Sequence, residues 1–109
     1  MGVVKPERFD VFLISLDPTQ GAEIQKTRPC VIISPDEMNR PLKTIIVAPM
    51  TSQLKDYPTR VYVKFQGKEG EIVLDQIRTV DKSRIIKKLG RINEKTSSEL
   101  IKVLSQIFS

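Results

Sequence analysis

The chain has 109 residues, of which 39% are hydrophobic and 28% charged, and a net charge of +5 that mildly favours a polyanionic partner. This composition is typical of one soluble globular domain, which we expect to span residues 1–109. The sequence has no histidine and one cysteine, which excludes Ser-His-Asp or Cys-His catalysis and any His- or Cys-based metal site, so we expect no metal and no cofactor.

Apolar residues that alternate with polar ones, or that run continuously, indicate strands in the first two-thirds of the chain. Six strands are predicted, at residues 8–16, 29–34, 44–51, 59–65, 71–80 and 84–92. Turn residues separate them at intervals of about ten residues, which favours a small barrel or sandwich over a parallel α/β sheet. Cys30 lies inside the second apolar run and is interpreted as a small core side chain.

The last part of the chain has the spacing of an amphipathic helix, predicted over residues 94–108. Its N-cap is either Asn93 or Thr96, which could form a capping box with Glu99. The apolar face of this helix could serve the core or a partner. This face consists of Leu100, Ile101, Leu104, Ile107 and Phe108.

No apolar run of the sequence is long enough to cross a bilayer, so we expect a cytoplasmic protein without membrane contact.

Two basic residues stand at the entry of the second predicted strand, in the run Lys26-Thr27-Arg28-Pro29. Proline fixes an extended entry into the strand, so Arg28 is held close to a rigid element. A guanidinium in this position can bind two phosphate oxygens at once. Taken alone, the pattern favours a solvated loop arginine.

A third predicted strand ends abruptly in Thr51, Ser52 and Gln53. Hydroxyls and amides at a strand end can donate hydrogen bonds to phosphate or to base edges. The alternative is an ordinary turn in which Thr51 and Ser52 bond their own backbone.

Polar residues also interrupt the otherwise apolar stretch 74–84, where Asp75, Gln76 and Arg78 could line a groove or form a solvated face. A basic run without acidic residues follows. It could track a nucleic-acid backbone, or it could protect the exposed edge of a sheet. The basic run consists of Lys82, Arg84, Lys87, Lys88 and Arg91.

Three motifs in this order resemble the MazF/PemK family of toxin endoribonucleases from bacterial toxin–antitoxin pairs. They are Asp17-Pro18-Thr19 leading to Lys26-Thr27-Arg28-Pro29, then Ala48-Pro49-Met50-Thr51-Ser52-Gln53, then residues 74–82 (LDQIRTVDK). The resemblance covers nearly the whole chain. It implies a small SH3-like β-barrel with a C-terminal helix, a homodimer, and an acidic antitoxin as partner.

The resemblance also implies metal-independent cleavage of single-stranded RNA, with Arg28 and Thr51 as the catalytic pair. The 2′-OH would attack its own phosphate and leave a 2′,3′-cyclic phosphate and a 5′-OH. Glu23 is the candidate for the base or for orienting Arg28. Further RNA contacts are expected from Lys26, Thr27, Ser52, Gln53, Gln76 and Arg78.

Two other functions compete with this one. A gyrase poison of the CcdB type would share the fold, but such proteins end in Trp-Gly-Ile, whereas this chain has no tryptophan and ends in Gln106-Ile107-Phe108-Ser109. A barrel that merely binds nucleic acid would not need Arg28 and Thr51 together.

Overall fold

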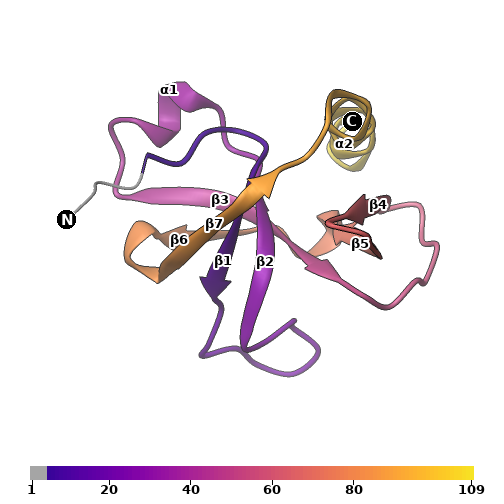
Figure 1. Cartoon of the computed structure of the whole chain (residues 1–109), viewed down its shortest axis with the longest axis horizontal. Coiled ribbons are helices and arrows are strands. Elements are labelled where there is room, and N and C mark those ends of the chain that lie inside the picture. The colour runs from indigo at the N-terminus through magenta and orange to yellow at the C-terminus, as the bar shows by residue number, and fades with distance from the viewer. Residues whose placement is uncertain (1–4) are drawn as a thin grey trace.

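The computed structural model describes residues 5–109, so the first four residues of the expected domain lie outside the described part. Seven strands are followed by one long C-terminal helix (Figure 1). The strands are β1 (Asp10–Ser15), β2 (Thr27–Ile32), β3 (Thr44–Thr51), β4 (Arg60–Phe65), β5 (Lys68–Val73), β6 (Arg78–Asp81) and β7 (Ile85–Arg91). The helices are α1 (Asp36–Asn39) and α2 (Glu94–Ile107), and two 3₁₀ turns cover Leu74–Gln76 and Lys82–Arg84.

The strands form one curled sheet in the order β4-β5-β3-β2-β1-β7, and β6 adds to β3 outside this path. All pairings are antiparallel. β3 is the centre of the sheet, because it pairs with β2, β5 and β6 along different parts of its length. The expected mainly β fold with a C-terminal helix is confirmed, with seven strands in place of about six.

The predicted strand over residues 71–80 is wrong as a single element. The chain leaves β5 after Val73, makes the 3₁₀ turn Leu74–Gln76, and re-enters the sheet as β6. Leu74 is buried, whereas Asp75 and Gln76 bond to segments elsewhere in the chain. Those long-range bonds favour the turn, although the apolar pattern runs on through it.

The core consists of two apolar clusters on opposite faces of the curled sheet. Val11 on β1 belongs to one cluster, whereas its neighbour Phe12 belongs to the other. Side chains alternate along a strand, so a strand covered on both faces carries consecutive apolar residues. Cys30 lies in the second cluster and is fully buried, which confirms its interpretation as a core residue.

Helix α2 packs against β4 and completes the first cluster. Asn93 is its N-cap, because the Asn93 side-chain oxygen accepts a hydrogen bond of 2.8 Å from the N–H of Thr96. Leu100 is buried, so the inner face of the helix serves the core, whereas Phe108 just beyond its end is 71% exposed. Within residues 5–109, neither helix is long and apolar enough to cross a membrane.

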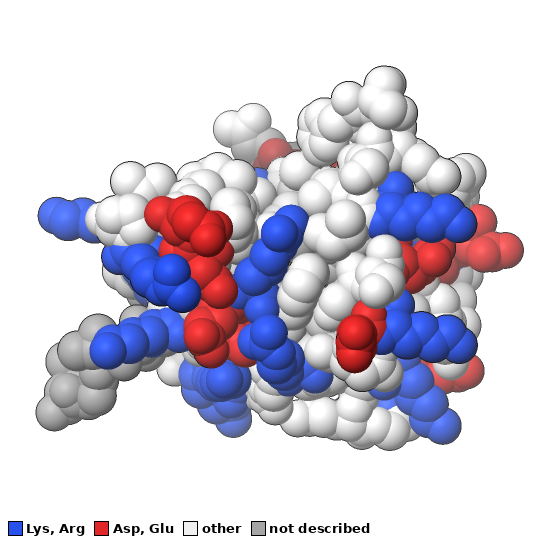
Figure 2. Space-filling view, turned by 90° about the horizontal axis from the view of Figure 1, so that it is seen from above, with Lys and Arg blue, Asp and Glu red and all other residues white. Residues whose placement is uncertain are grey.

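The short helix α1 was not predicted. The buried Asn39 ends it and bonds Ser34, whose hydroxyl also contacts the Ile46 backbone on β3. Figure 2 looks down on the end of the molecule where α1 and α2 lie. On this face, basic and acidic side chains are interleaved, so the positive net charge does not gather there.

Candidate active site

Arg28, Thr51 and Ser52 line one cavity of about 280 Å³ at the edge of the sheet. Arg28 is the second residue of β2, Thr51 ends β3, and Ser52 begins the following loop. The rest of the lining comes largely from the β4–β5 hairpin and is apolar on one side and polar on the other. Its members are Pro29, Met50, Val63, Phe65, Leu89, Gln66, Lys68, Glu69 and Gly70.

Strand register explains why Arg28 and Thr51 meet. β2 and β3 are antiparallel, with Cys30 opposite Pro49. Continued by two residues, toward the start of β2 and the end of β3, the same register places Arg28 opposite Thr51. Both side chains therefore stand at the ends of hydrogen-bonded strands, which hold a catalytic group more firmly than a free loop does.

Both side chains retain groups that can bind a phosphate. The Nε of Arg28 donates to the Gln25 carbonyl oxygen at 3.3 Å, and its terminal Nη groups have no hydrogen-bond partner within residues 5–109. The Oγ1 of Thr51 accepts from the Gln53 N–H at 3.2 Å, as the turn interpretation expected. That bond uses an acceptor site and leaves the Thr51 hydroxyl proton to donate.

The thiol of Cys30 lies beneath this site. Burial raises its pKa to about 12, although the nearby guanidinium groups of Arg78 and Arg28 oppose the rise. The thiol is therefore neutral at physiological pH and is not a nucleophile.

Glu23, Gln76 and Arg78 line a second cavity, of about 360 Å³, on the other side of the β1–β2 loop. The Gln76 side-chain oxygen accepts from the Ile24 N–H at 2.8 Å, and Arg78 donates to the Leu16 carbonyl oxygen at 3.1 Å. The carboxylate of Glu23 accepts from the Gln20 N–H at 2.7 Å. Gln76 and Arg78 hold the β1–β2 loop, and none of the three lines the cavity of Arg28 and Thr51, although Arg78 and Arg28 both lie near the Cys30 thiol.

The three remaining candidates are exposed on the flanking segments. The backbone N–H of Lys26 donates to Asp17 at 2.8 Å, which closes the base of the β1–β2 loop. Thr27 is paired with Ser15 at the start of β2. Gln53 contributes its N–H to Thr51 and leaves its side chain on the surface.

Most of the basic run has partners inside the protein. Arg84 donates to the carbonyl oxygens of Ser15 and Asp17, so it also holds the β1–β2 loop. Lys88 and Arg91 pair with the buried carboxylate of Asp10. β7 is an edge strand of the sheet, as the edge-strand interpretation expected, and contact of this run with a nucleic-acid backbone stays a prediction.

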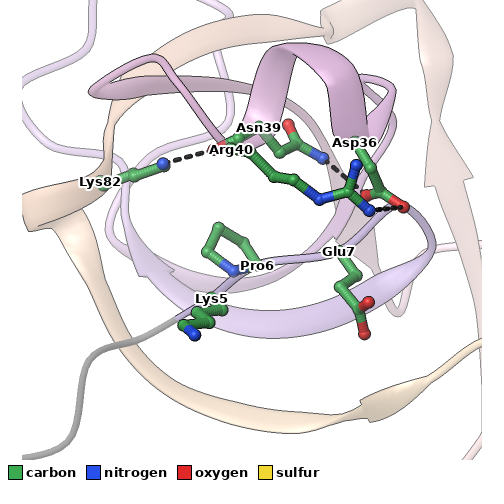
Figure 3. Close-up of a pocket in the computed structure, with 7 residues that line it drawn as sticks. All are labelled: Lys5, Pro6, Glu7, Asp36, Asn39, Arg40 and Lys82. Carbon is green, nitrogen blue, oxygen red and sulfur yellow. Dashed lines mark hydrogen bonds and ion pairs between the residues drawn. The ribbon is translucent and has the colours of Figure 1, made fainter.

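A larger cavity, of about 610 Å³, lies between the N-terminal segment and α1 (Figure 3). Several of its polar groups are engaged with one another: Asp36 accepts from Asn39 and pairs with Arg40, and Lys82 donates to the Asn39 carbonyl oxygen. Hydrogen bonds, above all from the Arg8 N–H, lower the pKa of Asp36. These engaged groups are less available to a ligand than the Nη groups of Arg28.

Two residues of the site were missed in the sequence. Glu69 lines the cavity of Arg28, with a carboxylate oxygen that accepts a hydrogen bond from the Tyr62 hydroxyl at 2.8 Å, and Gly70 lies against Thr51. The signal for Gly70 was a glycine inside a strand, which often marks a close approach of another backbone. Within residues 5–109, no three Cys, Asp or Glu side chains gather as a metal-binding cluster.

Comparisons with known proteins identify the family and the fold. Residues 7–108 match the sequence profile of the family described as "PemK-like, MazF-like toxin of type II toxin-antitoxin system". The chain is 39% identical over 99 residues to the endoribonuclease MazF of Staphylococcus saprophyticus, a match that covers 85% of this chain and 82% of that protein.

Two solved structures share the fold. MazF from Deinococcus radiodurans superposes with a TM-score of 0.86, at 24% identity, over 97% of this chain and 98% of its own. A mycobacterial endoribonuclease in complex with its cognate antitoxin superposes with a TM-score of 0.78, at 21% identity, over 94% of each chain.

Proposed function

The chain belongs to the PemK-like, MazF-like family of toxins of type II toxin–antitoxin systems, and from this premise we propose that it is an endoribonuclease. It cleaves single-stranded RNA at specific sequences and needs no metal ion. The observation that carries the proposal is that Arg28 and Thr51 share one cavity and both keep free donors there. The name of the relative from Staphylococcus saprophyticus supports the activity.

In the proposed reaction, the ribose 2′-OH loses its proton to a base and forms a bond to the adjacent phosphorus. The bond from phosphorus to the 5′-oxygen breaks, and that oxygen takes up a proton. The products are a 2′,3′-cyclic phosphate and a 5′-OH. The free Nη groups of Arg28 stabilise the charged phosphorane, and the Thr51 hydroxyl holds a non-bridging oxygen.

Two carboxylates are candidates for the base. Glu69 lines the cavity of Arg28, whereas Glu23 lines the neighbouring cavity and bonds the backbone of its own loop. Comparing Glu69→Gln with Glu23→Gln decides between them, because removal of the base abolishes the acidic limb of the pH–rate profile. An arginine is a poor base because it keeps its proton in this pH range.

We also propose two protein partners: a second copy of the chain, and an acidic antitoxin that covers the site. The mycobacterial relative in complex with its cognate antitoxin supports the second. A flexible acidic segment could occupy the cavity next to Arg28 and exclude RNA, folding as it binds.

Primer extension on a long, largely unstructured RNA in EDTA tests the function. We expect wild type to cut at one short recurring sequence, and Arg28→Ala and Thr51→Ala each to lower the rate by about 10²–10³. Arg40→Ala and Thr79→Ala are matched controls, since both residues are exposed and lie outside the cavity. Intact RNA with folded wild type would refute the proposal and favour a gyrase poison or a binding module.

A further inference from the structure

The loop between β3 and β4, residues 52–59, begins directly after the proposed catalytic Thr51. It carries Ser52 and Gln53, which are proposed to contact RNA, and it exposes the large side chains of Leu54 and Tyr57. Such a loop is well placed to contact the bases next to the cleaved phosphate, provided that its conformation is fixed before RNA arrives.

One buried carboxylate holds this loop. Glu71 on β5 is 4% exposed and stands opposite Thr51 in the β3–β5 register. Its Oε1 accepts from the Lys55 N–H at 3.1 Å and its Oε2 accepts from the Asp56 N–H at 2.8 Å. Asp56 has a φ of +56°, a conformation that a non-glycine residue adopts only when its surroundings hold it there.

Arg60 extends the same network. Its Nη1 lies 3.8 Å from the Glu71 carboxylate, and its Nε donates to Asp75 at 3.1 Å. The guanidinium also stacks on the ring of Tyr57, 5.0 Å from its centroid. One cation therefore joins two carboxylates to an aromatic side chain of the loop.

A buried carboxylate is costly unless hydrogen bonds and an opposite charge compensate it. Glu71 receives both kinds of compensation, and both of its hydrogen bonds come from the loop backbone. The arrangement thus makes the shape of the loop depend on Glu71.

We propose that Glu71 is a positioning residue for RNA recognition: it fixes the β3–β4 loop so that cleavage is restricted to the preferred sequence. This inference rests on the proposed ribonuclease function. A fixed loop loses little conformational entropy on binding and rejects bases that do not fit, whereas a mobile loop adapts to many sequences.

The test compares wild type with Glu71→Gln. Glutamine keeps the size of the side chain, but it puts an NH₂ donor in place of one of the two carboxylate oxygens, so one of the two loop N–H groups then faces a donor. Glu99→Gln is the matched control, because Glu99 is exposed on α2. The measured quantity is kcat/KM on two RNA oligonucleotides, one with the preferred sequence and one with a single base changed beside the cleaved bond.

We expect Glu71→Gln to lower the discrimination between the two oligonucleotides by roughly tenfold or more, the factor that follows from losing one hydrogen bond to a charged group. Most of the effect should be in KM, and Glu99→Gln should match wild type. Hydrogen exchange at the Lys55 and Asp56 amides should accelerate in Glu71→Gln alone.

A merely structural role gives a different result. If Glu71→Gln lowers only the folded fraction, both oligonucleotides are cleaved more slowly by the same factor and the ratio is unchanged, which overturns the inference. If Glu71→Gln fails to fold, Asp75→Asn is the second variant, because Asp75 binds Arg60 in the same network. Unchanged discrimination between the two oligonucleotides in Asp75→Asn would also overturn the inference. If wild type cleaves neither RNA, the proposed function itself fails.

Discussion

The carbonyl oxygen of Thr51 occupies the space that a side chain on Gly70 would need. A Cβ built on Gly70 would lie 2.6 Å from that oxygen, well inside van der Waals contact. β5 can therefore approach the end of β3 only because residue 70 has no side chain. The position of the Thr51 backbone, and with it the Thr51 hydroxyl, depends on this contact.

Gly70→Ala should therefore displace Thr51. We expect the free energy of unfolding to fall by about 1–3 kcal/mol, as for other overpacked sites, and RNA cleavage to fall further than the loss of folded protein explains. Urea unfolding and kcat/KM measure the two effects. Gly67→Asn is the control, because an added Cβ meets nothing there and asparagine tolerates its positive φ. Full activity in Gly70→Ala would contradict the prediction.

The N-cap of α2 offers a test on stability. Asn93→Ala should lower the free energy of unfolding by about 1 kcal/mol, because the Thr96 N–H loses its acceptor. Thr96→Ala should have a much smaller effect, since Asn93 and not Thr96 caps the helix. Thermal or urea unfolding of both variants measures the difference, and a larger loss in Thr96→Ala would instead support the capping box with Glu99.

Acid should weaken the network around Arg60. Partial burial of Asp75 favours its neutral form, but hydrogen bonds from Arg60 and Thr59 outweigh this and lower its pKa below the usual 3.8. A lowered pKa in the folded state adds stability above pH 3.8, and this stability is lost as the pH falls through the folded-state pKa. Asp75→Asn should therefore flatten the fall of unfolding free energy below about pH 4. A slope equal to wild type would refute this assignment.

The thiol of Cys30 should react only when the protein unfolds. Its side chain is fully buried, and burial raises its pKa from 9.0 to about 12. At pH 9, a thiol reagent should label urea-unfolded chains rapidly and folded chains at the rate of opening. A raised folded-state pKa also means that stability falls as the pH rises above 9.0. Rapid labelling without denaturant would show that the second core cluster is open.

The sequence predicted best those elements that turn residues enclose on both sides. The strand at residues 44–51 was predicted with the bounds that β3 has in the structure. The break in the strand at Leu74–Gln76 was not predicted, because the hydrogen bonds that favour it, such as the one between Gln76 and the Ile24 N–H, link residues far apart in the sequence. Helix α1 was not predicted for a different reason: it is only four residues long and is held by a local bond from Asn39 to Ser34.

The candidate site divides in the same way. Arg28 and Thr51 were paired through the family resemblance of three motifs, and the structure places them in one cavity. The role of Gln76 and Arg78 in holding the β1–β2 loop could not be predicted from the sequence, because it depends on how β6 docks beside that loop. Glu71 left one visible signal, an acidic residue directly before the apolar run Ile72-Val73-Leu74.

The order of the supports along the chain has a consequence for protein synthesis. Arg28 and Thr51 leave the ribosome first, and several of the groups that hold the two flanking loops come later, on Glu71, Gln76 and Arg84. The second edge of β1 is paired only after β7 has been made. A nascent or truncated chain that ends after β4 would carry both proposed catalytic side chains beside loops that lack these supports. We expect each newly made molecule to become selective only once translation is nearly complete.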